Sequence, residues 1–131
     1  MEKQGKRMLK EVRLSNFLSF GPHASGIELK PLNILVGANG SGKSNFIESL
    51  ALLKTAPFHI ADLIRDGGGV KDWIYKGPGK EKNATIEIVT SDALRYRLSF
   101  TASGTKFEIV DEVLECESPG EDEKRPCFFY K

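Results

Sequence analysis

Apolar positions in the first part of the chain form short clusters separated by turn residues, a pattern that predicts β-strands. The three expected strands span residues 9–14, 27–30 and 32–36. The third is a short continuous apolar run, with Ile34, Leu35 and Val36 in succession, which is typical of a buried strand.

Helical spacing follows this third strand. Phe46, Leu50 and Leu53 recur at i, i+4 and i+7, which predicts a helix over residues 45–54 that ends before Pro57. A second short helix is expected over residues 60–66.

Glycines bracket the next segment, residues 67–81, with Gly-Gly-Gly at its start and Gly-Pro-Gly near its end. Such punctuation predicts a flexible surface loop that does not belong to the core. Trp73 argues for the opposite interpretation, because a large aromatic ring is usually well buried.

From Ala84 onward the hydrophobic period becomes two, as expected for strands with one buried face. The apolar side chains that should share one face of the second strand of this region are Leu94, Tyr96, Leu98 and Phe100. A turn at residues 102–104 leads into a third strand over 106–115, and a last apolar stretch covers 127–130. Residues 82–131 are therefore predicted to form an antiparallel β meander.

The sequence Gly-Ala-Asn-Gly-Ser-Gly-Lys-Ser at residues 37–44 matches the phosphate-binding P-loop pattern G-x-x-x-x-G-K-[ST] at every fixed position. A predicted strand precedes it and a predicted helix follows it, which is the structural context that the motif requires. Glycines allow the backbone to bend with positive φ, so that successive N–H groups can surround a phosphate. The N-terminus of the following helix directs further N–H groups at the same anion.

These features predict a nucleotide site in which Lys43 places a positive charge on the β and γ phosphates and Ser44 completes the coordination shell of Mg²⁺. The expected nucleotide-binding residues are Gly37, Ala38, Asn39, Gly40, Ser41, Gly42, Lys43, Ser44 and Asn45. Ser44 is the expected metal ligand, and no catalytic residue can be assigned.

Composition limits the remaining alternatives. The chain has 131 residues, 40% of them hydrophobic, and a formal net charge of +1, which fits one globular domain or part of one. This charge balance by itself indicates no nucleic-acid partner. No apolar stretch has the length of a signal-peptide core or a membrane span, so we expect a cytoplasmic protein with no membrane partner. Cys116 and Cys127 lack metal-ligand spacing and are expected to be reduced.

The expected elements do not complete a P-loop enzyme. Such folds contain several parallel strands joined by crossover helices, each unit taking about 30 residues or more. One such unit is visible here. We therefore expect a single partial ATPase domain over residues 1–131, divided into 8–66, 67–81 and 82–131, whose parallel sheet is finished by residues outside this sequence.

Two stretches carry a family resemblance. Residues 14–20, Leu-Ser-Asn-Phe-Leu-Ser-Phe, and residues 31–45, which contain the P-loop and end in Asn45, resemble the N-terminal part of ABC-class P-loop ATPases of the RecF, SMC and AAA-like predicted-ATPase group. Transporter-type relatives usually carry Thr at the position of Asn45. The resemblance is specific over residues 9–54 and looser through the meander.

This resemblance implies an α/β fold, namely the N-terminal lobe of an ABC-type P-loop NTPase with an antiparallel β meander, and it implies ATP and Mg²⁺ as cofactors. It also implies that hydrolysis needs a C-terminal lobe and dimerisation, with a second copy and, through the complete protein, nucleic acid as partners. Leu18 stands where many relatives carry Arg or Lys, and Ala38 replaces a frequent Pro. A Q-loop glutamine, a Leu-Ser-Gly-Gly signature and a switch histidine have no counterpart.

Two other functions stay open. Asp111 and Glu112 follow an apolar run and resemble a Walker B strand, so a small self-contained P-loop NTPase or kinase is the enzymatic alternative. Hairpin geometry is the competing interpretation of this segment, because no crossover helix is predicted before it. The second alternative is a non-catalytic interaction module that binds nucleotide for structural support.

Overall fold

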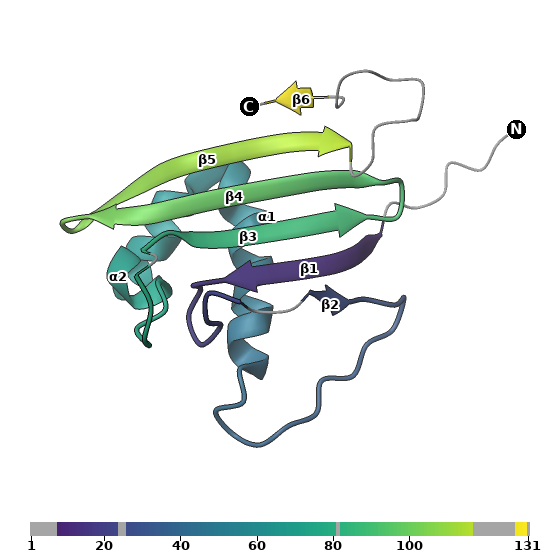
Figure 1. Cartoon of the computed structure of the whole chain (residues 1–131), viewed down its shortest axis with the longest axis horizontal. Helices are drawn as coiled ribbons and strands as arrows, with labels where there is room; N and C mark the ends of the chain where they lie inside the picture. The colour runs from purple at the N-terminus through teal and green to yellow at the C-terminus, as the bar shows by residue number, and fades with distance from the viewer. Residues whose placement is uncertain (1–7, 24–25, 81, 117–127, 131) are drawn as a thin grey trace, which may run out of the picture.

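The computed structural model describes residues 8–23, 26–80, 82–116 and 128–130. Six strands form one antiparallel sheet in the order β2-β1-β3-β4-β5-β6, and two helices lie behind it in the view of Figure 1. In chain order the elements are β1 (Leu9–Ser15), β2 (Ile27–Glu28), α1 (Lys43–Asp66), α2 (Val70–Trp73), β3 (Ala84–Thr90), β4 (Leu94–Ser103), β5 (Lys106–Cys116) and β6 (Phe128–Tyr130).

The antiparallel meander predicted for the second half is confirmed. β3 pairs with β4, and β4 with β5, each through a tight turn. β1 joins the same sheet by pairing with β3, so β1 and the meander belong to one continuous hydrogen-bonded sheet. The division of the chain into three parts stays a prediction.

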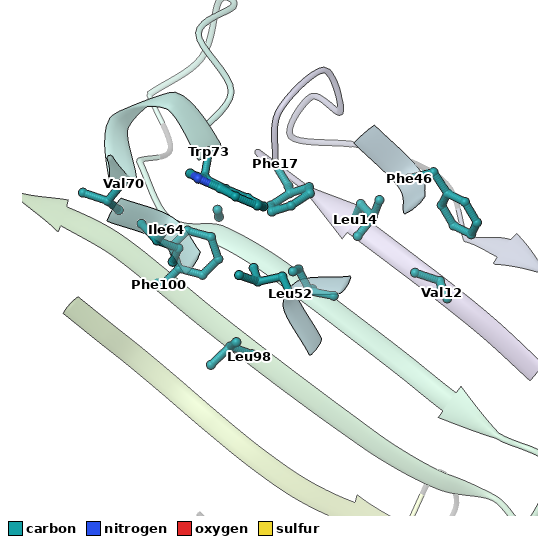
Figure 2. Close-up of a cluster of buried hydrophobic side chains, with 12 residues drawn as sticks. Val12, Leu14, Phe17, Phe46, Leu52, Ile64, Val70, Trp73, Leu98 and Phe100 are labelled. Carbon is teal, nitrogen blue, oxygen red and sulfur yellow. The ribbon is translucent and has the colours of Figure 1, made fainter. Parts of the chain in front are cut away.

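The core lies between the sheet and the helices. Alternate residues of β1, β3 and β4 point toward α1, as the period of two predicts, and Leu14, Ile86 and Phe100 are almost completely buried. Phe17 packs against Trp73 with ring centroids 5.8 Å apart and meets Phe100 edge-on at 6.4 Å (Figure 2). This aromatic cluster fixes the end of β1 against α2.

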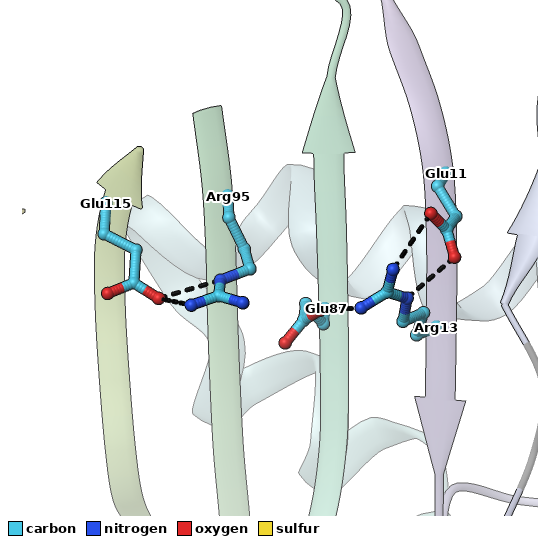
Figure 3. Close-up of polar contacts among 5 residues, drawn as sticks. All are labelled: Glu11, Arg13, Glu87, Arg95 and Glu115. Atoms are coloured by element: carbon cyan, nitrogen blue, oxygen red, sulfur yellow. Dashed lines mark hydrogen bonds and ion pairs between the residues drawn. The ribbon is translucent and has the colours of Figure 1, made fainter. Parts of the chain in front are cut away.

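The opposite face of the sheet carries charged side chains that pair with one another. Arg13 of β1 bonds Glu11 on its own strand at 2.7 Å and Glu87 of β3 at 3.0 Å (Figure 3). The hydrogen bond from Arg13 holds the pKa of the Glu11 carboxyl below its usual value. Farther along the same face, Arg95 of β4 bonds Glu115 of β5, with Nε and Oε1 2.8 Å apart.

The flexible surface loop predicted for residues 67–81 is not what the structure shows. Residues 70–73 form the short helix α2, and Val70 and Trp73 are only 2% and 6% exposed. The prediction that this segment stays outside the core is therefore wrong, because the apolar surface offered by Phe17 and Ile64 buries Trp73 despite the flanking glycines.

Helix α1 is longer than predicted. It begins at Lys43 and continues past Pro57 to Asp66, with an interruption at His59, where φ is −147° and ψ is 43°. The expected second helix exists, but the break lies two residues beyond the proline. Neither helix in the described part of the chain has the combination of length and apolar character that would let it cross a bilayer.

Residues 32–36 do not form the predicted buried strand. They have no regular secondary structure, and Leu32, Ile34 and Val36 are 81%, 81% and 89% exposed. A strand needs a neighbour to satisfy its backbone N–H and C=O groups, and no described strand lies beside this segment.

The cysteine expectation also changes. Cys116, the last residue of β5, is disulfide-bonded, so the prediction of a reduced thiol is wrong for this residue. Cys127 lies outside the described residues.

Candidate nucleotide-binding site

The P-loop leads directly into the long helix, as the sequence predicts. Residues 31–41 form an exposed connection, and α1 begins at Lys43. Gly40 and Gly42 have φ values of 82° and 96°, in the left-handed region that favours glycine. Gly42 is the N-cap of α1 and provides no side chain, so no side-chain hydrogen bond caps the first N–H groups of the helix.

Lys43 lies at the centre of the loop. Its Nζ donates to the carbonyl oxygens of Gly37 at 2.5 Å and Ala38 at 2.8 Å, and to Ser41 Oγ at 3.2 Å. A Cβ at position 37 would lie 2.6 Å from Ser41 Oγ, so a larger residue there would require the Ser41 side chain to move. The ammonium group is thus held within the loop by short contacts to three loop oxygens.

A small open hollow of about 180 Å³ lies at the start of the helix. It is lined by Asn39, Gly40, Gly42, Lys43, Ser44 and Asn45. Six of the nine predicted site residues therefore meet around one space, and the other three surround the Lys43 ammonium. Backbone N–H donors, an ammonium and a hydroxyl are the groups that bind a polyphosphate, so the residues present fit a nucleotide phosphate chain.

The P-loop also contains a candidate ligand for Mg²⁺. Ser44, in the first turn of α1, lines the hollow and provides a hydroxyl oxygen of the type that Mg²⁺ accepts. Within residues 8–23, 26–80 and 82–116, no group of three or more His, Cys, Asp or Glu side chains gathers. A Mg²⁺ ion here would therefore rely on phosphate and water for its other ligands.

Ser19 contacts the P-loop helix, and sequence reasoning assigned it no role. Its Oγ accepts a hydrogen bond of 2.8 Å from Asn45 Nδ2, which joins the turn after β1 to the first turn of α1. The sequence feature that could have indicated this role is the Asn-Phe-Leu-Ser-Phe stretch, which is part of the family resemblance but has no function assigned to its serine there. Leu18 beside it lines a second hollow of about 340 Å³ with Leu63 and Trp73, and it does not line the P-loop hollow.

Asp111 and Glu112 lie elsewhere. Both are in β5, which pairs antiparallel with β4, and neither lines the P-loop hollow. Asp111 bonds Arg97 at 2.9 Å, and Glu112 accepts a hydrogen bond of 2.7 Å from the Tyr96 hydroxyl. The hairpin interpretation of this segment is confirmed.

The fold and the loop define an α/β protein of the P-loop NTPase type with an antiparallel β meander. A family model described as "AAA domain, putative AbiEii toxin, Type IV TA system" matches residues 32–127. The match covers most of the chain, so the chain belongs to this family.

Two further comparisons, one of sequence and one of structure, find similarity to SMC proteins. The chain is 24% identical over 110 residues to "Structural maintenance of chromosomes protein 3 homolog" of Plasmodium falciparum (isolate 3D7). This match covers 83% of this chain and 8% of that protein. A solved structure described as "Structural biochemistry of ATP-driven dimerization and DNA stimulated activation of SMC ATPases" matches with a TM-score of 0.58 and 21% identity, over 81% of this chain and 67% of that chain.

These comparisons confirm the predicted resemblance to ABC-class, SMC-like P-loop ATPases, and the structural match confirms the fold class. The chain spans less than a tenth of the length of the curated relative.

Proposed function

We propose that this chain is the ATP-binding N-terminal lobe of an ABC-class, SMC-like ATPase. The observation that carries the proposal is the Lys43 ammonium, held among loop oxygens beside an uncapped helix N-terminus and a hollow lined by six P-loop residues. This is a concentration of positive charge and N–H donors, and its ligand is a phosphate chain.

Each site residue has a specific part in this proposal. The N–H groups of residues 39–45 surround the β phosphate, and Lys43 exchanges its loop carbonyl contacts for the β and γ phosphate oxygens. Ser44 would hold Mg²⁺, which would neutralise charge on the phosphates. The choice of ATP over GTP rests on family resemblance and on the absence of an Asn-Lys-x-Asp sequence.

Hydrolysis, in this proposal, requires a C-terminal lobe. Leu32, Ile34, Leu35 and Val36 are exposed immediately before the P-loop, which supports a strand that gains its neighbours from residues outside this sequence. The solved SMC structure is described in terms of ATP-driven dimerisation and stimulation by DNA. A second copy and nucleic acid are accordingly the partners that we propose for the complete protein, and the cytoplasmic localisation stays a prediction.

The self-contained NTPase is the weaker alternative. It needs Asp111 and Glu112 near the γ phosphate, whereas Asp111 bonds Arg97 and Glu112 bonds Tyr96 within the meander. The non-catalytic interaction module is distinguished from the leading proposal by turnover, since a module that binds nucleotide for support would hydrolyse none after a C-terminal lobe is added.

Calorimetry with Mg-ATP tests the binding site. Lys43→Ala should weaken binding by about tenfold or more, because a charge-assisted hydrogen bond contributes about 1.5 to 3 kcal/mol. Lys54→Ala is the matched control, because Lys54 is an exposed lysine of the same helix with no contact to the loop among the described hydrogen bonds. Equal affinities for wild type and Lys43→Ala would refute the assignment.

Phosphate release at saturating ATP tests the requirement for a second lobe. The 131-residue chain should show no turnover above the Lys43→Ala variant, and the same chain joined to a C-terminal lobe should turn over. Robust hydrolysis by the 131-residue chain that Glu112→Gln abolishes would overturn the proposal in favour of the self-contained enzyme.

A further inference from the structure

The turn that follows β1 has an unusual backbone that is firmly attached to the core. Asn16 and Leu18 have φ values of 51° and 49°, a conformation that is uncommon for residues other than glycine. Phe17, between them, is fully buried against Trp73. The Leu18 N–H donates to the Trp73 carbonyl at 2.9 Å, and the Tyr75 N–H donates to the Asn16 carbonyl at 2.8 Å. The turn is therefore fixed from the side of the sheet and α2.

Ser19 extends from this turn toward the P-loop, as the Phe20 ring beside it also does. Its Oγ accepts from Asn45 Nδ2 at 2.8 Å. It also lies close to Gly42, where an added Cβ would be 3.0 Å from the same Oγ. The hydroxyl of Ser19 thus bonds a side chain of the first helical turn and lies close to the N-cap residue of α1.

The rest of the P-loop has few other attachments to the sheet. Residues 31–41 are exposed throughout, and no side chain caps the N-terminus of α1. Phe46 is buried one turn into the helix and packs that face of α1 against the core. An apolar contact is non-directional, so it does not by itself determine how the N–H groups at the start of the helix are oriented. A hydrogen bond is directional, so the bond between Ser19 and Asn45 can set that orientation.

We propose that Ser19 is a positioning residue of the nucleotide site, which orients the first turn of α1 and the N–H groups of residues 42–45 through its hydrogen bond to Asn45. This inference rests on the proposed function, because the ligand that benefits is the ATP phosphate chain. Ser19 itself need not touch the nucleotide. Because this turn is attached to the sheet and α2, the bond from Asn45 to Ser19 holds the P-loop helix in a defined position relative to the sheet.

A positioning role and a merely structural role differ in what Ser19→Ala changes. Ser19 is exposed and Asn45 is half-buried, and a hydrogen bond that water can reach adds little to global stability because water replaces it. Ser19→Ala should therefore leave thermal unfolding nearly unchanged while weakening Mg-ATP binding by about fivefold, the size of one neutral hydrogen bond. Ser19→Thr retains the hydroxyl and should restore most of the affinity.

The experiment is a double-mutant cycle on the 131-residue chain, measured by calorimetry with Mg-ATP. Ser19→Ala, Asn45→Ala and the double variant are compared, with Ser103→Ala as the control because Ser103 lies at the far turn between β4 and β5. Adding Ser19→Ala to Asn45→Ala should cost no further affinity. Full additivity of the two losses, or a Ser19→Ala variant with reduced stability and unchanged affinity, would overturn the positioning role.

Amide hydrogen exchange without nucleotide separates this inference from the proposed function. Residues 43–46 should exchange several-fold faster in Ser19→Ala than in wild type, while Ser103→Ala should match wild type. If wild type binds no Mg-ATP, the proposed function fails, and with it the role of Ser19 in nucleotide binding. If wild type binds Mg-ATP but Ser19→Ala changes neither affinity nor exchange, the inference alone is overturned.

Discussion

Trp73 offers a prediction in which two effects of similar size oppose each other. Its ring is 6% exposed and packs against Phe17, but its indole Nε1 is buried with no hydrogen-bond partner among the described residues. An added Cβ at Gly67 would lie 2.8 Å from this nitrogen, so the backbone of residue 67 closes directly over it. The packing stabilises the fold, whereas the unpaired N–H group opposes folding.

Two substitutions separate these effects. Trp73→Ala removes the whole ring and should cost about 3 to 5 kcal/mol of unfolding free energy, as large aromatic truncations in a core do. Trp73→Phe loses part of the ring, which is equivalent to roughly two buried carbon groups or about 1.6 kcal/mol. It also removes the unpaired donor, whose burial costs about 1 to 3 kcal/mol. The two contributions nearly cancel, so we expect Trp73→Phe to lie within about 1 kcal/mol of wild type.

Urea unfolding followed by circular dichroism measures both variants without relying on the tryptophan signal. Phe17→Leu is a suitable control, because it reduces a buried ring in the same cluster that has no polar atom to relieve. That variant should lose about 1 to 2 kcal/mol. A Trp73→Phe loss of about 3 kcal/mol or more would show that the indole N–H is satisfied in solution and would refute the reasoning.

Two further predictions concern charged side chains of the meander. Asp111→Asn with Glu112→Gln should leave Mg²⁺-dependent nucleotide affinity unchanged by calorimetry, because neither side chain lines the P-loop hollow, and a large loss would restore the Walker B interpretation. Arg95→Ala should lower the unfolding free energy by about 2 to 4 kcal/mol, because it leaves the buried Glu115 carboxylate without its guanidinium. Replacing both residues, as Arg95→Met with Glu115→Leu, should cost less than Arg95→Ala alone, and an equal cost would count against this explanation.

The parts of this fold that the sequence predicts well are those determined by local patterns. The P-loop is one example, since Gly40, Gly42 and Lys43 occupy their places through backbone geometry that is encoded within a few residues. The meander is another, because the alternation that ends at Phe100 determines which side chains of β4 share a face. Neither prediction needs information about distant residues.

Tertiary contacts explain where the predictions fail or are silent. The glycines around residues 70–76 indicate a loop, yet the burial of Trp73 depends on Phe17, which is distant in sequence. The bond between Ser19 and Asn45 likewise joins residues 26 positions apart, and no local pattern encodes it. The pairing of Cys116 also requires the structure, since the sequence shows the thiol but not its environment.

The conflict at residues 32–36 is of a different kind. The sequence predicts burial, the structure shows Leu32, Ile34 and Val36 exposed, and the described residues contain no element that could cover them. Two more large apolar side chains, Ile47 and Phe58, are exposed on α1, although the same helix buries Phe46 and Leu52. Single exposed apolar residues are ordinary, but here a run of exposed apolar residues lies directly before a P-loop, and further apolar residues are exposed on the adjoining helix α1. The pattern of residues 32–36 is consistent with a strand whose neighbours lie outside the described residues, which is what the proposed C-terminal lobe would provide.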